Sequence, residues 1–464
     1  MRLFGKMVGV LAAAYAVAMV PYARAANQTD KEDYVHEPLP PGFQVTISEF
    51  EGPVFADANG RTLYKWPKKG LRNGDAGEVQ GKPTCGDKPV TENSGFLSPY
   101  PGGLEMPGVD TNTRAACTDV WPVVFAPADA KPVGKWTVVS RLDGRNQWAY
   151  DGWPMYTSAL DKRPGDVNGG TAIMVVGEAG ALRHPVSPQP NVPSQFSVET
   201  SMFGRLVVLR DGWSVYTFDG DGRNKSNCID TCLKEWTPIL APASAGPIAD
   251  WTILERAPGI LQWAFRGRPL YRHLGDSKIG ALDGSDIPRW HNVYTQMTPP
   301  PPAGFTMKNT IVGLVLGDAN GKTVYRYNCA DDAVDQLACD NPESPQLYRF
   351  AVCGGGDPDR CVKAFPYVLA PTGAKSGNQL WGTMYIDPKT GKSTAPSAPG
   401  ALNVWTFRSR PVYTFAGSKN YGDRKPSDIN ANGWGEVNGA RNGYFAMIYR
   451  DIYESRDGGS GGFQ

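Results

Sequence analysis

Aspartates in turn-like segments are the residues of this sequence best suited to chemistry. Six of them lie in or just after short hairpin-like segments: Asp161, Asp166, Asp219, Asp221, Asp276 and Asp286. Carboxylate oxygens are the hard ligands that Ca²⁺ prefers, so one hypothesis is calcium binding. The alternative is that each carboxylate accepts backbone N–H bonds within a turn. The cluster around Asp219 does not match an EF-hand, because Arg223 occupies a ligand position.

Aromatic side chains beside the same segments are the second set of candidates. Trp153 and Trp213 directly follow turn glycines, which predicts that their rings are exposed. Tyr156, Tyr216 and Tyr271 stand at the ends of apparent strands. Exposed rings stack on sugars and other ring-shaped ligands, so these five residues are the predicted ligand contacts. The alternative is that such rings pack in the core of a small β-domain.

Groups for catalysis are sparse. The Gly-x-Ser-x-Gly pattern around Ser460 lies in a Gly-rich tail, without the strand, turn and helix that a nucleophile elbow needs. The four histidines stand in four different contexts: His36, His184, His273 and His291. We therefore predict no catalytic residue. A hydrolase that uses one specialised copy of the repeat described below remains the alternative.

Electron transfer is a third class. Cys-x-x-Cys-His is absent, which excludes covalent c-type haem by that signature. An accessory protein that holds haem through His273, methionine or tyrosine stays open, and a Soret band would reveal it.

The eight cysteines predict disulfides. Cys117, Cys232 and Cys361 are equivalent, because each precedes an aromatic residue by four positions and then Pro and Ala-Pro. The preceding cysteine in each copy is the natural partner, and two cysteines remain for a loop of the third copy. The predicted pairs are Cys85–Cys117, Cys228–Cys232, Cys353–Cys361 and Cys329–Cys339. A metal site is the rival interpretation, but no Cys-x-x-Cys is present.

These candidates lie on a module that occurs three times, each copy holding two hairpins. The first hairpin ends at Tyr64, Tyr216 and Tyr325, after Asn59-Gly60, Asp211-Gly212 and Asn320-Gly321. The second ends at Tyr156, Tyr271 and Tyr413, each preceded by Pro two positions earlier. Asn-Gly between apolar residues predicts type I′ turns. Repetition of this kind is typical of a scaffold or a binder with several sites.

Length, charge and the N-terminus limit the protein class. The 464 residues allow about three domains of ~150 residues. The net charge of +1 gives no electrostatic reason to expect nucleic-acid binding. Arg2 and Lys6 precede an apolar run too short to span a bilayer, and Ala23-Arg24-Ala25 fits a cleavage site. We expect no transmembrane segment and a soluble periplasmic or secreted protein.

The predicted architecture is all-β. Three tandem small barrel-like or sandwich-like domains, each of two hairpin repeats, are favoured by a polyproline linker and unequal copies; a six-bladed propeller-like closure is the alternative. The expected segments are a signal peptide (1–25), an extended arm (26–45), repeat domain 1 (46–175), a linker (176–200), repeat domain 2 (201–297), a polyproline linker (298–303), repeat domain 3 (304–454) and a flexible tail (455–464).

The module resembles the secreted-repeat, lipoprotein-associated family, whose tandem copies carry a Tyr-x4-Asp motif. The motif stands here as Tyr156-x4-Asp161, Tyr216-x4-Asp221 and Tyr271-x4-Asp276. In the other three units the position of the Asp holds Lys69, Ala330 and Ser418, and the signal-proximal cysteine of the lipoprotein members is missing. Members of the family are exported bacterial proteins without an assigned biochemical role. The resemblance therefore implies an architecture and no ligand.

The repeat pattern and the sparse catalytic groups favour an exported, non-catalytic binding or surface-interaction protein. Its partner could be a protein, a glycan or a small molecule, and calcium is the one cofactor that the aspartates suggest.

Overall fold

The computed structural model describes residues 30–67, 69–71, 74–87, 116–169, 184–310, 313–329, 342–343, 345–417 and 442–451. Strands dominate, and every pair of named strands in this part is antiparallel. The all-β prediction is confirmed. The sheets are small, with two to five strands, and none of those described closes into a barrel.

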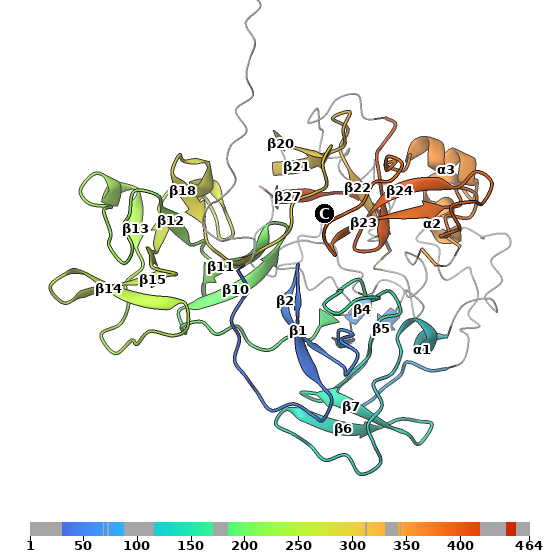
Figure 1. Ribbon diagram of the computed structural model, residues 1–464, viewed down its shortest axis with the longest axis horizontal. Helices are drawn as coiled ribbons and strands as arrows, with labels where there is room; N and C mark the ends of the chain where they lie inside the picture. The colour runs from blue at the N-terminus through green and yellow to red at the C-terminus, as the bar shows by residue number, and fades with distance from the viewer. Residues whose placement is uncertain are drawn as a thin grey trace, which may run out of the picture.

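The first repeat occupies the blue-to-teal part of the ribbon (Figure 1). Its elements are β1 (Gln44–Ser48), β2 (Gly52–Ala56), β3 (Tyr64–Lys65), β4 (Lys69–Leu71), β5 (Gly74–Ala76), α1 (Cys117–Val120), β6 (Trp136–Ser140), β7 (Asn146–Tyr150), β8 (Trp153–Pro154) and β9 (His184–Pro185).

The second repeat is described without a gap. Its elements are β10 (Phe196–Ser201), β11 (Gly204–Leu209), β12 (Tyr216–Phe218), η3 (Cys232–Lys234), β13 (Trp236–Pro238), β14 (Trp251–Ala257), β15 (Ile260–Phe265), β16 (Arg268–Pro269), β17 (Tyr271–His273), η4 (Asp283–Asp286), β18 (Trp290–Asn292) and β19 (Tyr294–Met297).

The third repeat adds two helices to the same plan. Its elements are β20 (Thr306–Thr310), β21 (Gly313–Gly317), β22 (Tyr325–Cys329), α2 (Leu347–Gly354), α3 (Pro358–Ala364), β23 (Trp381–Ile386), β24 (Leu402–Phe407), β25 (Arg410–Tyr413), β26 (Asn442–Ala446) and β27 (Ile448–Asp451). Helix α3 begins where Asp357 accepts N–H bonds from residues 359 and 360 and Pro358 fits the first turn. Sequence periodicity did not predict these helices.

A late residue closes each repeat in the same way. In the second repeat, Val293 donates its N–H to Val215 and accepts one from Val207. Val186 in the first repeat and Met447 in the third make the equivalent pair of bonds. Strand β9 and the start of β10 therefore fall inside residues 176–200, the segment predicted as a linker. The predicted domain boundaries otherwise stay predictions.

The two hairpins of each repeat meet at their terminal tyrosines. Tyr64 faces Tyr156, Tyr216 faces Tyr271, and Tyr325 faces Tyr413 across antiparallel strands. The two halves of a repeat are thus related by an approximate twofold arrangement around a tyrosine pair.

The predicted type I′ turns are not where the sequence suggested. Gly60 has a positive φ of 79° but Asn59 does not, and the Asp57 carboxylate instead accepts N–H bonds within this turn. A type I′ turn needs positive φ at both central residues. That condition holds in the second hairpins, at Asp151-Gly152 and Arg266-Gly267. Asn-Gly alone therefore misassigned the turn, because the Asp side chain before it competes for the same backbone groups.

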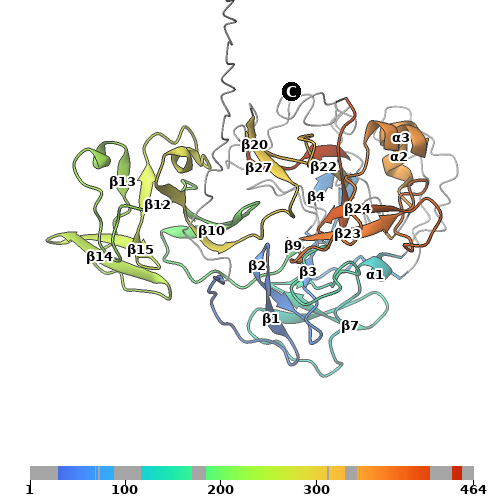
Figure 2. The same cartoon turned by 45° about the horizontal axis from the view of Figure 1, so that its top comes forward.

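The three repeats share one apolar cluster. Phe50 and Val54 from the first repeat, Met202 from the second, and Trp381 and Phe407 from the third are all buried in it. The ribbon accordingly shows three groups of sheets gathered about a common centre (Figure 2). Packing of this kind makes the repeats parts of one body, although the strands of each pair almost entirely within their own repeat.

The arm before β1 runs along the second repeat. Glu32 is buried and forms a two-pronged ion pair with Arg205, at 3.0 Å for both N–O contacts. Thr295 donates a further hydrogen bond to the same carboxylate. Farther along, Glu37 accepts a hydrogen bond from Tyr150 of the first repeat. The arm therefore connects two repeats by polar contacts. Residues 1–29, which include the predicted signal peptide, and the predicted tail lie outside the described residues.

Candidate functional site: paired tyrosines and carboxylates

In the second repeat, the motif tyrosine of each hairpin forms a hydrogen bond with the aspartate of the other hairpin. Tyr216 donates its hydroxyl to Asp276, at 2.9 Å from Oδ1, and Tyr271 donates to Asp221 at 2.8 Å. Each motif tyrosine therefore binds the aspartate that follows the other tyrosine. The exchange follows from the antiparallel pairing of the two tyrosines, which carries each hydroxyl towards the loop of the opposite hairpin.

The first repeat keeps this exchange with one substitution. Tyr64 donates to Asp161 at 2.8 Å, as the plan requires. Lys69 stands where the other aspartate would be, and Glu78 replaces it by accepting from Tyr156 at 2.5 Å. Glu78 was not among the predicted site residues. It lies in an insertion beyond the motif, so no spacing rule marks it.

Burial determines the ionisation of these groups. Desolvation raises the pKa of Asp161 to about 7, although hydrogen bonds from Tyr64 and the Asn168 amide work in the opposite direction. Burial likewise raises the pKa of Asp276 and Asp221. The pKa of each paired tyrosine is also raised, first by burial and then by the neighbouring carboxylate in most cases. The tyrosines are therefore neutral donors at pH 7.

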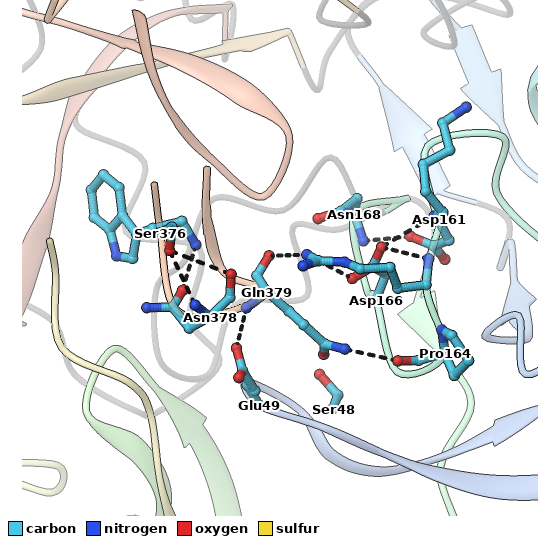
Figure 3. Close-up of polar contacts among 12 residues, drawn as sticks. Ser48, Glu49, Asp161, Pro164, Asp166, Asn168, Ser376, Asn378 and Gln379 are labelled. Atoms are coloured by element: carbon cyan, nitrogen blue, oxygen red, sulfur yellow. Dashed lines mark hydrogen bonds and ion pairs between the residues drawn. The ribbon is translucent and has the colours of Figure 1, made fainter. Parts of the chain in front are cut away.

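The predicted calcium ligands do not gather into one site. Asp161 and Asp166 lie near each other in the first repeat, where backbone N–H groups of residues 162, 163 and 168 occupy their oxygens (Figure 3). Asp219 accepts from Arg268 and His291, and Asp286 from Arg450. Within the described ranges, no group of three or more Asp, Glu, His or Cys residues is placed to hold a metal. Calcium binding therefore stays a prediction, and the described residues contain no cluster of ligands for it.

The predicted aromatic contacts divide into two kinds. Trp153 and Trp213 are half-buried, and the Arg272 guanidinium lies 3.8 Å from the ring of Trp213. Tyr156, Tyr216 and Tyr271 are almost fully buried, with their hydroxyls bound as above. The two tryptophans are therefore less exposed than predicted, since Trp153 also packs against the core of the first repeat, and the three tyrosines are enclosed. Ligand binding by any of the five stays a prediction.

Three predicted disulfides are confirmed. Cys85–Cys117, Cys228–Cys232 and Cys353–Cys361 are at bonding distance. In the first two repeats an arginine ties the disulfide to the core: Arg141 donates to the Cys85 carbonyl, and Arg256 to that of Cys228. Cys339 lies outside the described residues, so the fourth predicted pair is untested.

In the third repeat a positively charged side chain lies beside the motif tyrosine pair, where the first two repeats have carboxylates. Arg349, on α2, is fully buried and donates to the hydroxyls of Tyr444 at 3.0 Å and Tyr367 at 2.5 Å. Its guanidinium also lies 5.0 Å from the ring of Tyr413, the counterpart of Tyr156 and Tyr271. The sequence motif did not point to Arg349, because the helix that carries it is an insertion.

One exposed apolar residue recurs at the same position in all three repeats. Phe125, Leu240 and Leu369 each follow a buried or mostly buried aliphatic residue and precede Ala-Pro. Their exposed fractions are 44%, 51% and 60%. Each pairs through its backbone with the middle strand of its second hairpin. Repetition at equivalent positions separates these residues from a scattered surface leucine such as Leu142.

His273, the histidine that follows a motif tyrosine, is held within the core of the second repeat. His273 contacts Asp276 at 3.3 Å, but its ring packs against Trp236 and the carboxylate also accepts from Tyr216. One small pocket lies in the third repeat beside Gln346 and Tyr413, and another lies between the arm and Trp251. Neither is lined by His273. Ser460 lies outside the described residues.

Comparison with known proteins bears on two segments. Residues 137–171 and 197–239 match the model of a family described as a secreted repeat of unknown function. The matches cover the second hairpin of the first repeat, including Tyr156 and Asp161, and the first hairpin of the second repeat, including Tyr216 and Asp221. The resemblance inferred from the sequence is confirmed for these two copies.

The two matched segments thus coincide with hairpins that hold tyrosine–carboxylate pairs. No curated protein and no solved structure matches the chain. Among the described residues, no helix is long enough and apolar enough to cross a membrane.

Proposed function

We propose that this chain is an exported, non-catalytic protein that binds a partner through surfaces repeated in its three modules. It acts in the periplasm or outside the cell, and its partner is a protein, a glycan or a small molecule. The secreted-repeat matches support export.

The observation that carries the proposal is the recurrence of Phe125, Leu240 and Leu369. Exposing an apolar side chain to water is unfavourable, at about 25 cal/mol per Å². A solvent-exposed residue with no role would be free to become polar in at least one copy of a diverged repeat. All three copies keep an apolar side chain, although their insertions, charges and helices differ.

The polar groups support binding over catalysis. The aspartates and tyrosines of the first two repeats, which are the groups that could act as acids or bases, are bound to one another or to other protein donors. Equivalent pairs occur in two repeats, as expected of structural elements. A catalytic group in one specialised copy would instead stand apart from its counterparts.

The test is a thermal-shift series on the oxidised protein with EDTA, Ca²⁺, haem and a glycan panel. A ligand at 100 times its Kd adds about 2.7 kcal/mol to stability. The shift produced by a true ligand should be lost in the triple variant Phe125→Ser, Leu240→Ser and Leu369→Ser.

Leu142→Ser is the matched control, because Leu142 is fully exposed but does not belong to the recurring set. The control should keep the shift. If the triple variant keeps it too, the recurring residues are not the binding surface. Turnover of any glycan in the panel would contradict the non-catalytic role.

A further inference from the structure

The disulfide of the second repeat differs from the other two described disulfides in its exposure. In those two, both partners are buried: Cys85 and Cys117, and Cys353 and Cys361. Cys228 is also buried, but its partner Cys232 is only half-buried. Thiol–disulfide exchange requires that an attacking thiolate reach one of the two sulfurs. Of the three bonds, Cys228–Cys232 is therefore the most open to attack, at Cys232.

The ring that this disulfide closes is also the smallest of the three. The sequence separation is 4 for Cys228–Cys232, against 32 for Cys85–Cys117 and 8 for the pair in the third repeat. A disulfide restricts the unfolded chain less when the ring is small. Reduction of Cys228–Cys232 is therefore expected to destabilise the fold less than reduction of either other pair.

Hydrogen bonds hold the same loop in place without involving the sulfurs. Arg256 donates to the carbonyl of Cys228 at 2.7 Å. The N–H of Cys232 donates to the carbonyl of Ile229 at 3.0 Å. These bonds do not depend on the disulfide, so they keep the two cysteines close after reduction and allow the bond to form again.

Exposed apolar side chains lie close to Cys232. Ile229 and Leu233 belong to the same loop and are 61% and 40% exposed. Leu274 is 53% exposed, and its N–H donates to the carbonyl of Glu235, whose own N–H donates to Cys232. Single exposed leucines are common on protein surfaces, but three of these side chains close to one accessible disulfide form a patch that suits a partner protein.

The first and third repeats have different residues at these positions. The residues that follow the two paired cysteines are Gly86 and Thr118 in the first repeat, and Gly354 and the half-buried Val362 in the third. The apolar flank and the exposed cysteine thus occur together in the second repeat. This distinguishes the patch from Leu240, whose exposed counterparts recur in the other two repeats.

We propose that Cys228–Cys232 is a thiol–disulfide exchange site for a dithiol protein of the same compartment, which docks on Ile229 and Leu233. A thiolate of the partner attacks the sulfur of Cys232, forms a mixed disulfide and releases Cys228 as a thiolate. The partner's second thiolate then attacks the partner's own sulfur in the mixed disulfide, which completes the partner's disulfide and releases Cys232 as a thiolate.

Two electrons pass from the partner to this chain. The two released thiolates take up two protons, which balance those lost by the partner's thiols. The exchange is stoichiometric, goes beyond the binding role proposed above and does not depend on the surfaces that carry it.

The first experiment is timed reduction of the whole oxidised chain by dithiothreitol under native conditions. Samples are quenched in acid, denatured and alkylated, and mass spectrometry then measures the fraction of each cysteine that was reduced. Because exchange requires access, Cys228–Cys232 should open at least about tenfold faster than the other two described disulfides. Equal rates, or earlier opening of either other pair, would overturn the proposal. The readout uses the wild type and does not depend on the folding of a variant.

Two variants that each leave one thiol of the pair test the point of attack. Cys232 in Cys228→Ser should form a mixed disulfide with glutathione disulfide at least about tenfold faster than Cys228 does in Cys232→Ser, since Cys228 is buried. The reverse order would contradict attack at Cys232.

Reduced thioredoxin is the probe for docking of a dithiol protein. Ile229→Ser combined with Leu233→Ser should slow reduction by thioredoxin about threefold to tenfold, because apolar contact is lost, and should leave reduction by dithiothreitol unchanged. Leu142→Ser alters a fully exposed leucine of the first repeat and should keep both rates. No reduction of the wild type by thioredoxin, no loss in the double variant, or equal loss with both reductants would exclude the patch as the docking surface.

Discussion

The second and third repeats have the same tyrosine framework but opposite charge at its centre. In the second, Tyr216 and Tyr271 donate to Asp276 and Asp221. In the third, the tyrosines at the guanidinium accept hydrogen bonds from Arg349. These acceptors, Tyr444 and Tyr367, are not the motif pair, because Tyr444 stacks on Phe365 as Trp290 stacks on Trp236 in the second repeat, and the motif tyrosine Tyr413 meets Arg349 only through its ring. The comparison teaches that the tyrosine pair is the constant element of the module and that the aspartate of the motif is replaceable.

The largest effect on stability is expected from the buried aromatic stack that the second and third repeats share. Trp236 is 2% exposed and stacks on Trp290 with ring centroids 3.5 Å apart. Phe365, its counterpart four residues after the equivalent cysteine, stacks on Tyr444 at 3.8 Å. Trp236→Ala and Phe365→Ala should each lower the free energy of unfolding by about 3 to 5 kcal/mol, by loss of burial and formation of a cavity.

Scanning calorimetry with Trp213→Ala as the half-buried control measures these costs. A cost below about 1 kcal/mol for Phe365→Ala, with the full cost for Trp236→Ala, would show that the two repeats differ in packing as well as in charge.

The second-largest effect is a pH dependence of folding stability, which arises in the repeats that carry buried aspartates. The folded pKa of Asp161 is about 7, above the ordinary value of 3.8, so the folded chain binds a proton that the unfolded chain has lost. Stability therefore falls as pH rises from about 4 to about 7 and levels off above that. Between pH 5 and pH 8 the loss from this residue is about 2 to 3 kcal/mol.

Asp161→Asn should remove this part of the pH dependence, measured as Tm against pH for both proteins. Asp221 and Asp276 act in the same direction, since burial raises their pKa too, so some dependence should remain in the variant. The third repeat has Ser418 at the motif position. Parallel curves for the two proteins would contradict the raised pKa of Asp161.

Sequence reasoning succeeded where the signal was local. Recurring turns and strand-end tyrosines indicated three all-β modules, and alignment of Cys117, Cys232 and Cys361 identified three disulfides. It failed where partners come from different hairpins or from insertions. The exchange between Tyr216 and Asp276 depends on strand pairing across many residues, and Glu78 and Arg349 lie in segments without a motif. Spacing along the chain carries no information about such contacts.

The smallest effect is expected from a comparison of the first two repeats, in which the tyrosine–carboxylate hydrogen bond is buried to different extents. Tyr156 donates to Glu78, which is 1% exposed, whereas Tyr271 donates to Asp221, which is only half-buried. Removing a donor from a buried charged acceptor costs about 1.5 to 3 kcal/mol, and water can replace a donor lost at an accessible one. Tyr156→Phe should therefore destabilise the chain by that amount, and Tyr271→Phe by about 1 kcal/mol or less.

Calorimetry of both variants, together with Tyr156→Phe combined with Glu78→Gln, tests this difference. In the double variant the acceptor is no longer charged, so the cost of losing the tyrosine hydroxyl should shrink relative to that in the single variant. Equal costs for Tyr156→Phe and Tyr271→Phe would mean that the depth of the carboxylate does not govern the pair. The tyrosine framework of the first two repeats would then owe its stability to ring packing, since both motif tyrosines are buried.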